Sequence, residues 1–172
     1  MAPHEWLTQE LASLAWYAHY LREALLDPEV LQPGKNACAA AAKYLVEWED
    51  LIPDTDPLFG YVDDLFAVLL GFQQLAHQGG PAGKTYVEME LPSGATLSQR
   101  IAEAKSLFGP FWDYLEKELQ VGFREVAMAI EADPAHVDQL VTMLKNYIDG
   151  YMERTVAPID ADALARFLAQ YQ

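Results

Sequence analysis

Prolines divide this sequence into stretches that carry the apolar repeat of amphipathic α-helices. Nine of the ten prolines stand at positions 28, 33, 53, 57, 81, 92, 110, 134 and 158. Because proline lacks a backbone donor and its ring clashes with the preceding turn, each marks a point where a helix ends, begins or bends. The sequence therefore predicts an all-α fold, a compact bundle of several helices.

The N-terminal part shows the helical repeat most clearly. Its apolar side chains alternate spacings of four and three residues before Asp27-Pro28 ends the helix. These side chains are Leu7, Leu11, Leu14, Ala18, Leu21 and Leu25. A second helix is expected over residues 35–48, where the small residues 37–42 would let another helix approach closely, and a third over residues 57–77.

One core is expected to join these three helices, because each is too amphipathic to be stable alone. The apolar stripe of the first helix would meet side chains around the start of the third. Those side chains are Leu51, Ile52, Leu58, Val62, Leu65, Phe66 and Leu69.

Helical periodicity returns in residues 98–172. One apolar stripe runs from Ile101 to Ile130, with a kink or break predicted at Gly109-Pro110. Another helix follows Asp133-Pro134. Asp160 is suited to cap a last helix, because its carboxylate can accept a hydrogen bond from the first turn.

The segment between these halves has a different pattern. Gly79-Gly-Pro-Ala-Gly83 resembles a phosphate-binding loop, but its glycine spacing is one residue short, so we interpret it as a linker. Alternating apolar residues then predict a short extended segment near 85–91. Its pairing partner would be residues 95–97 or another chain.

This reading divides the chain into three parts. A helical half (1–77) is followed by a linker with the extended segment (78–97) and a second helical half (98–172). The two halves are expected to pack as one domain, which suits the length of the chain.

Charge argues against several classes of partner. The chain holds 26 Asp and Glu against 11 Lys and Arg, a net charge of −15, so nucleic acid and anionic membranes would be repelled. The most apolar stretch, 58–76, contains Asp63 and Asp64, so we expect no membrane-spanning helix. A protein partner with a cationic surface remains compatible with this charge.

Two further features suggest a cytoplasmic location. Cys38 is the only cysteine, which excludes an internal disulfide and a cysteine-based zinc site. The N-terminus lacks the basic and apolar regions of a signal peptide. We therefore expect a cytoplasmic protein.

An acidic, proline-containing segment, here called the acidic elbow (residues 47–64), joins the second and third expected helices. It holds seven acidic residues, and no Lys or Arg occurs between Lys43 and Lys84. Its pattern, read from the preceding helix, is Tyr44-Leu45, Asp50-Leu51-Ile52-Pro53-Asp54, Pro57, Gly60-Tyr61 and Asp63-Asp64. This pattern resembles the signature of the YkvA-like bacterial family, domain of unknown function 1232.

The resemblance covers about residues 37–75. It implies a helix, a proline turn and a second helix, and it brings no established activity, cofactor or catalytic residue. The chain departs from the family at Thr55 and Asp56, where apolar residues are usual. These two residues make the elbow more polar. The candidate binding residues taken from the signature are Asp50, Pro53, Asp54, Gly60, Asp63 and Asp64.

The acids of the elbow have two interpretations. In the first they cap and pair within the fold: Asp56 caps a helix starting at Pro57, and other acids pair with residues such as Lys43, Arg22 or His19. At least one of the carboxylates of Asp63 and Asp64 should then face water or a polar partner, because an unpaired buried carboxylate is costly.

In the second interpretation, Asp54, Asp63 and Asp64 hold Mg²⁺ or Ca²⁺ through their carboxylate oxygens. The spacing does not match an EF-hand loop read from Asp54, because Leu65 stands where a bidentate Glu is needed.

The sequence favours a non-catalytic protein-interaction or adaptor protein that needs no cofactor. It contains no Gly-x-Ser-x-Gly nucleophile elbow and no pair of histidines one helical turn apart. The alternative is a metal-dependent enzyme that uses the acidic elbow to hold Mg²⁺ or Ca²⁺. A homodimer is also expected, because Val87, Met89 and Leu91 offer an apolar face that could pair across chains.

Overall fold

The structure is a computed structural model that describes residues 1–47, 51–52, 59–151 and 156–171. The described part is all-α, which confirms the predicted fold class, and no strand occurs in it. The helices are α1 (Pro3–Ala12), α2 (Leu14–Leu26), α3 (Gln32–Val46), α4 (Val62–Gln78), α5 (Gly80–Glu88), α6 (Leu97–Ala132), α7 (Ala135–Tyr151) and α8 (Ala161–Leu168). A short 3-10 turn, η1 (Ala169–Tyr171), follows α8.

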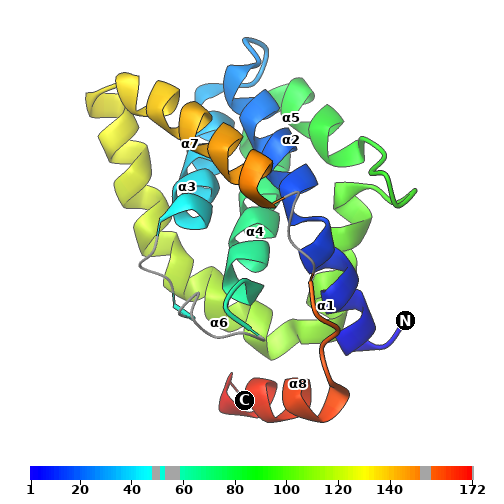
Figure 1. Cartoon of the computed structure of the whole chain (residues 1–172). Coiled ribbons are helices and arrows are strands. Elements are labelled where there is room, and N and C mark those ends of the chain that lie inside the picture. Colours follow the sequence, from blue (N-terminus) through cyan, green and yellow to red (C-terminus); the bar gives the residue numbers. More distant parts are fainter. Residues whose placement is uncertain (48–50, 53–58, 152–155, 172) are drawn as a thin grey trace.

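Helix α4 forms the centre of the bundle (Figure 1). Its first eleven residues, 62–72, are all buried, so it is enclosed by other helices on every side. Helices α3, α5 and α6 contact it directly, and α8 lies beneath its first turn in the view of Figure 1. No helix in the described residues is long and apolar enough to cross a membrane.

The predicted stripe of the first helix is confirmed, since all six of its apolar side chains are buried. The helix itself is divided, however, because α1 ends and α2 begins on either side of Ser13. The Ser13 hydroxyl donates to the carbonyl oxygen of Gln9 at 3.1 Å, and the residue adopts φ −92° and ψ 0°. Side-chain bonding of this kind competes with the helical ladder, which explains a break that apolar spacing does not reveal.

Helices α3 and α4 approach each other closely, as the small residues 37–42 predict. A Cβ atom added to Gly71 of α4 would lie 2.5 Å from the Cβ of Ala41. Near the start of α3, a Cβ atom on Gly34 would lie 2.4 Å from the Cα of Gly79. The backbones therefore meet where side chains are smallest, and larger residues cannot be inserted without moving them.

The segment predicted as a linker with an extended part needs correction. Residues 80–88 form α5, with Pro81 in its first turn, where a missing backbone N–H costs nothing. The alternation of Val87, Met89 and Leu91 also places Val87 and Leu91 four residues apart, and these two side chains are buried while Met89 is exposed. Two of the three side chains expected to mediate dimerisation are thus buried inside the fold.

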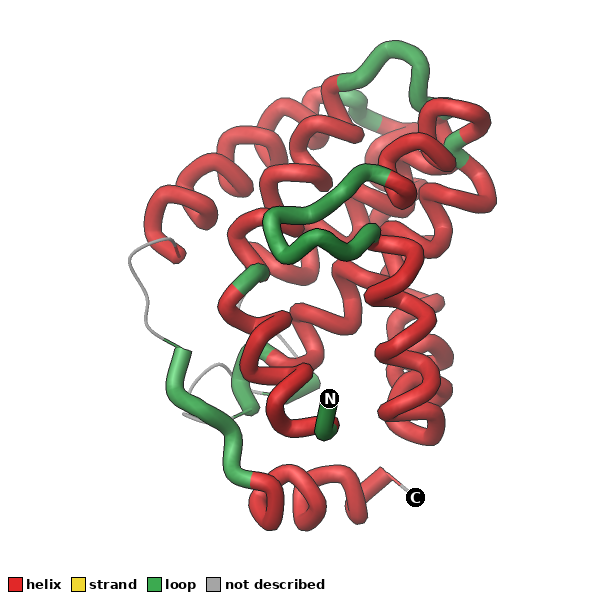
Figure 2. The backbone as a smooth tube through the Cα atoms, turned by 90° about the vertical axis from the view of Figure 1, so that its right-hand side faces the viewer, coloured by secondary structure: helices red, strands yellow, loops and turns green. Residues whose placement is uncertain are grey.

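The extended part is shorter than expected, and it pairs with the first of the two partners left open by the sequence, residues 95–97. Glu90 forms an isolated antiparallel bridge with Thr96, and the N–H of Leu91 donates to the carbonyl oxygen of Ala95 at 2.8 Å. Figure 2 shows this connection as a loop between two helices.

The C-terminal half follows the sequence closely. Helix α6 is kinked at Phe108, which has φ −127° and ψ 25°, two residues before Pro110. The Asp160 carboxylate caps α8 by accepting from the N–H of Ala163 at 2.9 Å. Phe167 of α8 stacks on Phe59, with ring centroids 4.4 Å apart. Helix α8 thereby covers the residues that lead into α4.

The predicted joint core is largely confirmed. Ile52, Val62, Leu65, Phe66 and Leu69 are buried with the stripe of α1 and α2. Leu51 was predicted wrongly, since its side chain is 43% exposed. In this segment the side chain of Ile52 is buried in the core and that of Leu51 is exposed. Leu58 lies outside the described residues.

Candidate functional site

Two candidate site residues, Asp63 and Asp64, begin α4 and are almost fully buried. Their exposed fractions are 0% and 1%. Both stand in the first turn of the helix, where the aligned backbone dipoles favour negative charge. The structure therefore places these carboxylates inside the bundle, at the end of its central helix.

Asp63 connects α3 to the polypeptide that follows it. Its Oδ2 atom accepts hydrogen bonds from the Tyr44 hydroxyl at 2.7 Å and from the N–H of Ile52 at 2.8 Å. The Tyr44 hydroxyl in turn accepts from the N–H of Leu51 at 2.8 Å. The prediction that at least one of the two carboxylates meets a polar partner is thus confirmed for Asp63.

Burial raises the pKa of the Asp63 carboxyl, and the hydrogen bonds from Tyr44 and Ile52 offset only part of that rise. Of the cations suggested as pairing partners for the elbow acids, Lys43 does pair with an acid of the elbow, whereas Arg22 pairs with an acid outside it. Lys43 forms an ion pair with Glu47, and Arg22 forms one with Glu23 at 3.1 Å. Hydrogen-bond donors close to Asp63, rather than these two cations, support its carboxylate.

The remaining candidate residues divide into two groups. Gly60 is described and buried, just before α4. Asp50, Pro53 and Asp54 lie outside the described residues, as does the proposed cap Asp56.

The metal hypothesis requires Asp54, which is not described, together with Asp63 and Asp64. Within the described residues no group of three His, Cys, Asp or Glu side chains is arranged to hold a metal ion. We expect millimolar Mg²⁺ or Ca²⁺ to leave the melting temperature unchanged, because an ion bound only by the folded state would stabilise it by mass action. A rise in melting temperature that Asp63→Asn abolishes would show that the carboxylates bind the ion.

The Asp63→Asn variant also tests the buried carboxylate. The amide keeps an oxygen acceptor, so the free energy of unfolding should change by at most about 2 kcal/mol. A carboxyl whose pKa is raised by folding contributes stability that is present below its unfolded pKa and is lost as pH rises through the folded pKa. Urea unfolding of both proteins should therefore show that the free energy of unfolding of the variant rises relative to that of the wild type as pH increases above about 4. An unchanged or reversed difference would contradict the assignment.

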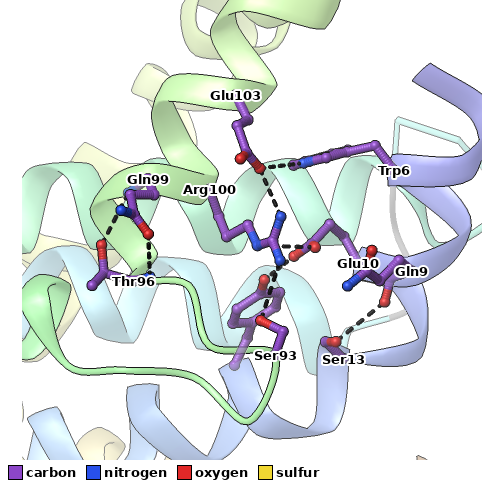
Figure 3. A network of polar contacts seen from close by, with 10 residues as sticks. Trp6, Gln9, Glu10, Ser13, Ser93, Thr96, Gln99, Arg100 and Glu103 are labelled. Atoms are coloured by element: carbon purple, nitrogen blue, oxygen red, sulfur yellow. Dashed lines mark hydrogen bonds and ion pairs between the residues drawn. The ribbon is translucent and has the colours of Figure 1, made fainter. Parts of the chain in front are cut away.

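A second polar cluster, which sequence reasoning missed, links α1, α2 and α6 (Figure 3). Arg100 is 6% exposed, and its Nε lies 3.3 Å from the Oε1 of Glu10, which is 1% exposed. The Arg100 guanidinium also donates to Glu103 at 2.7 Å and to the Ser93 hydroxyl at 3.2 Å. The hydroxyl of Tyr17 donates to Glu10. The two buried charges are therefore neutralised within one hydrogen-bonded cluster.

The pKa values in this cluster shift in opposite directions. Burial raises the pKa of Glu10, although the hydrogen bond from Tyr17 and the charge of Arg100 counteract it. Burial also acts to raise the pKa of Glu103, but hydrogen bonds from Trp6 and Arg100 outweigh it and lower that pKa. Burial of the cluster and these directional bonds give it a structural role in joining the first and sixth helices.

A signal for this cluster exists in the sequence. Glu10 lies three residues after Leu7 and four before Leu14, so it stands inside the apolar stripe. Arg100 occupies the same position between Leu97 and Ala104. A charge of each sign inside an apolar stripe predicts a buried ion pair.

Two open pockets flank α6 where it crosses α3, and Phe123 lines both. The first, here called the α3–α6 pocket, has a volume of about 500 Å³. Tyr44, which holds Asp63, is part of its wall. The acidic elbow also borders this pocket directly, since Glu47 and Leu51 line it.

The α3–α6 pocket has a mostly apolar lining and an excess of acidic residues, here called its rim. Apolar or small side chains form most of its lining; they are Ala40, Leu51, Leu119, Gly122, Phe123, Val126 and Ala129. Its charged residues are Glu47, Glu118, Glu125 and Lys43. Because Lys43 pairs with Glu47, the rim keeps a net negative charge.

Comparison with known proteins identifies one segment. Residues 35–70 match the family described as Protein of unknown function (DUF1232), which confirms the resemblance seen in the acidic elbow. No curated protein and no solved structure matches the chain. The matched residues supply the α3 wall of the α3–α6 pocket and the start of α4, whereas the opposite wall, from α6, lies outside the match.

Proposed function

We propose that this chain, with its DUF1232 segment as one wall of the site, is a non-catalytic interaction protein that binds a basic, amphipathic helix of a partner in the α3–α6 pocket. The observation that carries the proposal is the combination of apolar side chains and carboxylates in the lining of that pocket. An amphipathic helix buries its apolar face in such a groove, and its flanking cations would meet the rim.

Charge supports this choice of partner. Among the described residues, neither Glu118 nor Glu125 forms an ion pair, so both carboxylates are available to a cationic ligand. The net charge of −15 would also accelerate encounter with a cationic protein. A cytoplasmic location fits this proposal, because the single cysteine forms no disulfide within the chain and needs no oxidising compartment.

The surroundings of Asp63 and Cys38 give less support to the alternative of a metal-dependent enzyme. Asp63 is enclosed and its Oδ2 already accepts two hydrogen bonds, so this oxygen is not directed at an open pocket. Burial also raises the pKa of the Cys38 thiol to about 12, which makes it a poor nucleophile near neutral pH. We therefore prefer the interaction function. A homodimer would require one copy to supply the basic helix.

Charge reversal at the rim tests the proposal. The probe is a synthetic 18-residue helical peptide with leucine on one face and lysine on the other, and affinity is measured by fluorescence anisotropy. Glu118→Lys combined with Glu125→Lys should weaken binding at least about tenfold, the effect of losing two favourable charge contacts. Both side chains are exposed, so the fold should be retained.

The matched control carries the same change in net charge elsewhere. Glu88→Lys combined with Asp113→Lys alters two exposed acids that do not line the pocket. Equal weakening by both pairs would show attraction to the overall charge and contradict a specific site. A peptide in which every lysine is replaced by glutamate should not bind.

A further inference from the structure

The pocket on the other flank of α6 differs from the α3–α6 pocket in chemistry. It is open, has a volume of about 470 Å³ and lies between α3, α4 and α6. Five amide side chains line it: Gln32, Asn36, Gln74, Gln78 and Gln120. Among the described residues that line it, only Arg124 and Glu131 are charged, and they have opposite signs. We call it the amide groove.

Asn36 gives the strongest indication of a ligand. Its side chain lines the groove although the residue is only 8% exposed. Gln32 donates from Nε2 to the Oδ1 of Asn36 at 2.8 Å, which fixes the amide so that its NH₂ group is left as a donor. Among the described residues that NH₂ group makes no hydrogen bond. This donor reaches the open groove, where a ligand can supply its acceptor in place of water.

The amides are arranged in two pairs. Gln32 and Asn36 lie one turn apart on α3, and Gln74 and Gln78 lie one turn apart on α4, with Gln78 donating to Gln74 at 3.4 Å. Four residues of helix advance about 6 Å. An extended peptide presents successive main-chain groups on one side at intervals of about 6.6 Å. Because each pair is joined by its own hydrogen bond, the oxygen of one amide and the NH₂ group of the other remain at its two ends to bond neighbouring peptide groups.

We propose that the amide groove binds an extended, uncharged peptide segment through its main chain. Amide side chains supply both donors and acceptors, as a peptide main chain does, and they select no charge. Phe123 and Pro33 provide apolar contacts for side chains that point to the groove wall. The site is chemically distinct from the α3–α6 pocket and does not depend on the function proposed for that pocket.

The test uses a capped hexapeptide of alternating serine and valine, added at millimolar concentration to the ¹⁵N-labelled full chain. We expect it to shift the side-chain NH₂ resonances of Asn36 and of the groove glutamines. The same hexapeptide with alternate backbone nitrogens methylated loses main-chain donors and should produce much smaller shifts. Equal shifts from both peptides would overturn main-chain recognition.

A neutral hexasaccharide, maltohexaose, separates the proposal from sugar binding. Shifts caused by the hexasaccharide and not by the hexapeptide would overturn the proposal, as would the absence of shifts with either probe.

Variants locate the binding. Asn36→Leu removes the buried donor, and Gln120→Leu changes an exposed amide that folding does not need. Each should weaken the hexapeptide about three- to tenfold, the effect of one lost hydrogen bond. Gln139→Leu alters an exposed amide outside the groove and should leave affinity unchanged. Equal affinity of Gln120→Leu and wild type, with Asn36→Leu folded and also unchanged, would overturn the site.

Discussion

Replacing Arg100 by methionine is expected to lower the free energy of unfolding by about 3–5 kcal/mol. The change leaves the carboxylate of Glu10, which is 1% exposed, without its cation. Without that cation the pKa of Glu10, already raised by burial, should rise further. The variant should therefore lose more stability at pH 8 than at pH 5, because the uncompensated carboxylate must ionise as pH rises through its folded pKa.

Urea unfolding followed by circular dichroism measures this loss. Lys145→Met is the matched control, because Lys145 forms an exposed ion pair with Asp149 at 2.6 Å and should contribute less than about 1 kcal/mol. Adding Glu10→Gln to Arg100→Met removes the second charge and should recover part of the loss. A double variant no more stable than Arg100→Met at pH 8 would show that the buried charge is not the cause.

A second large effect is expected where α3 and α4 touch. Gly71→Ala would place a Cβ atom 2.5 Å from the Cβ of Ala41, so one of the two backbones must move. The expected loss is about 1–3 kcal/mol, the usual range for overfilling a tightly packed core. Gly34→Ala should cost at least as much, since its Cβ would lie 2.4 Å from the backbone of Gly79.

Gly122→Ala is the control for these substitutions. Gly122 lies within α6, and a Cβ atom there has no neighbour within 4 Å. Because alanine favours helix over glycine, this variant should be more stable by up to about 1 kcal/mol. Thermal unfolding should therefore show a lower melting temperature for Gly71→Ala and Gly34→Ala and a higher one for Gly122→Ala. Similar losses at Gly71 and Gly122 would contradict the close contact of α3 and α4.

The positions of the helices follow from patterns within each helix, which is why the sequence predicts them well. Apolar periodicity places the stripes of α2 and α6, Pro110 predicts the kink, and Asp160 predicts the cap of α8. These features depend on residues within one or two turns. They need no knowledge of what the helix contacts.

Errors arise where local patterns are ambiguous. Residues 87, 89 and 91 alternate as in a strand, yet Val87 lies in the last turn of α5, and only residues 90 and 91 pair in extended form with residues 95 and 96. The break at Ser13 depends on a side-chain hydrogen bond within a continuous apolar stripe. Apolar spacing alone distinguishes neither case.

The candidate sites were harder to predict than the fold. The family signature includes Asp63, but it does not indicate the hydrogen bond that Asp63 accepts from Tyr44. Glu10 and Arg100 are 90 residues apart in sequence, so the sequence indicates their ion pair only through their unusual positions within apolar stripes. The α3–α6 pocket is formed by two helices whose crossing no short motif encodes. Long-range packing therefore creates the sites, whereas local patterns create the helices.

Filling the α3–α6 pocket tests the central claim most directly. Gly122 lines that pocket and has open space around its Cβ position, so Gly122→Leu should occupy the site without disturbing the fold. Gly150→Leu is the matched control, because Gly150 also has open space and lies in α7, away from the pocket. Both variants keep the net charge of the wild type.

The measurement is calorimetric titration of each folded variant with the leucine–lysine helical peptide. We predict that Gly122→Leu weakens binding at least about tenfold, as expected when the groove for the apolar face of the helix is filled. Gly150→Leu should bind like the wild type. Undiminished affinity of Gly122→Leu would contradict the assignment of the α3–α6 pocket as the binding site.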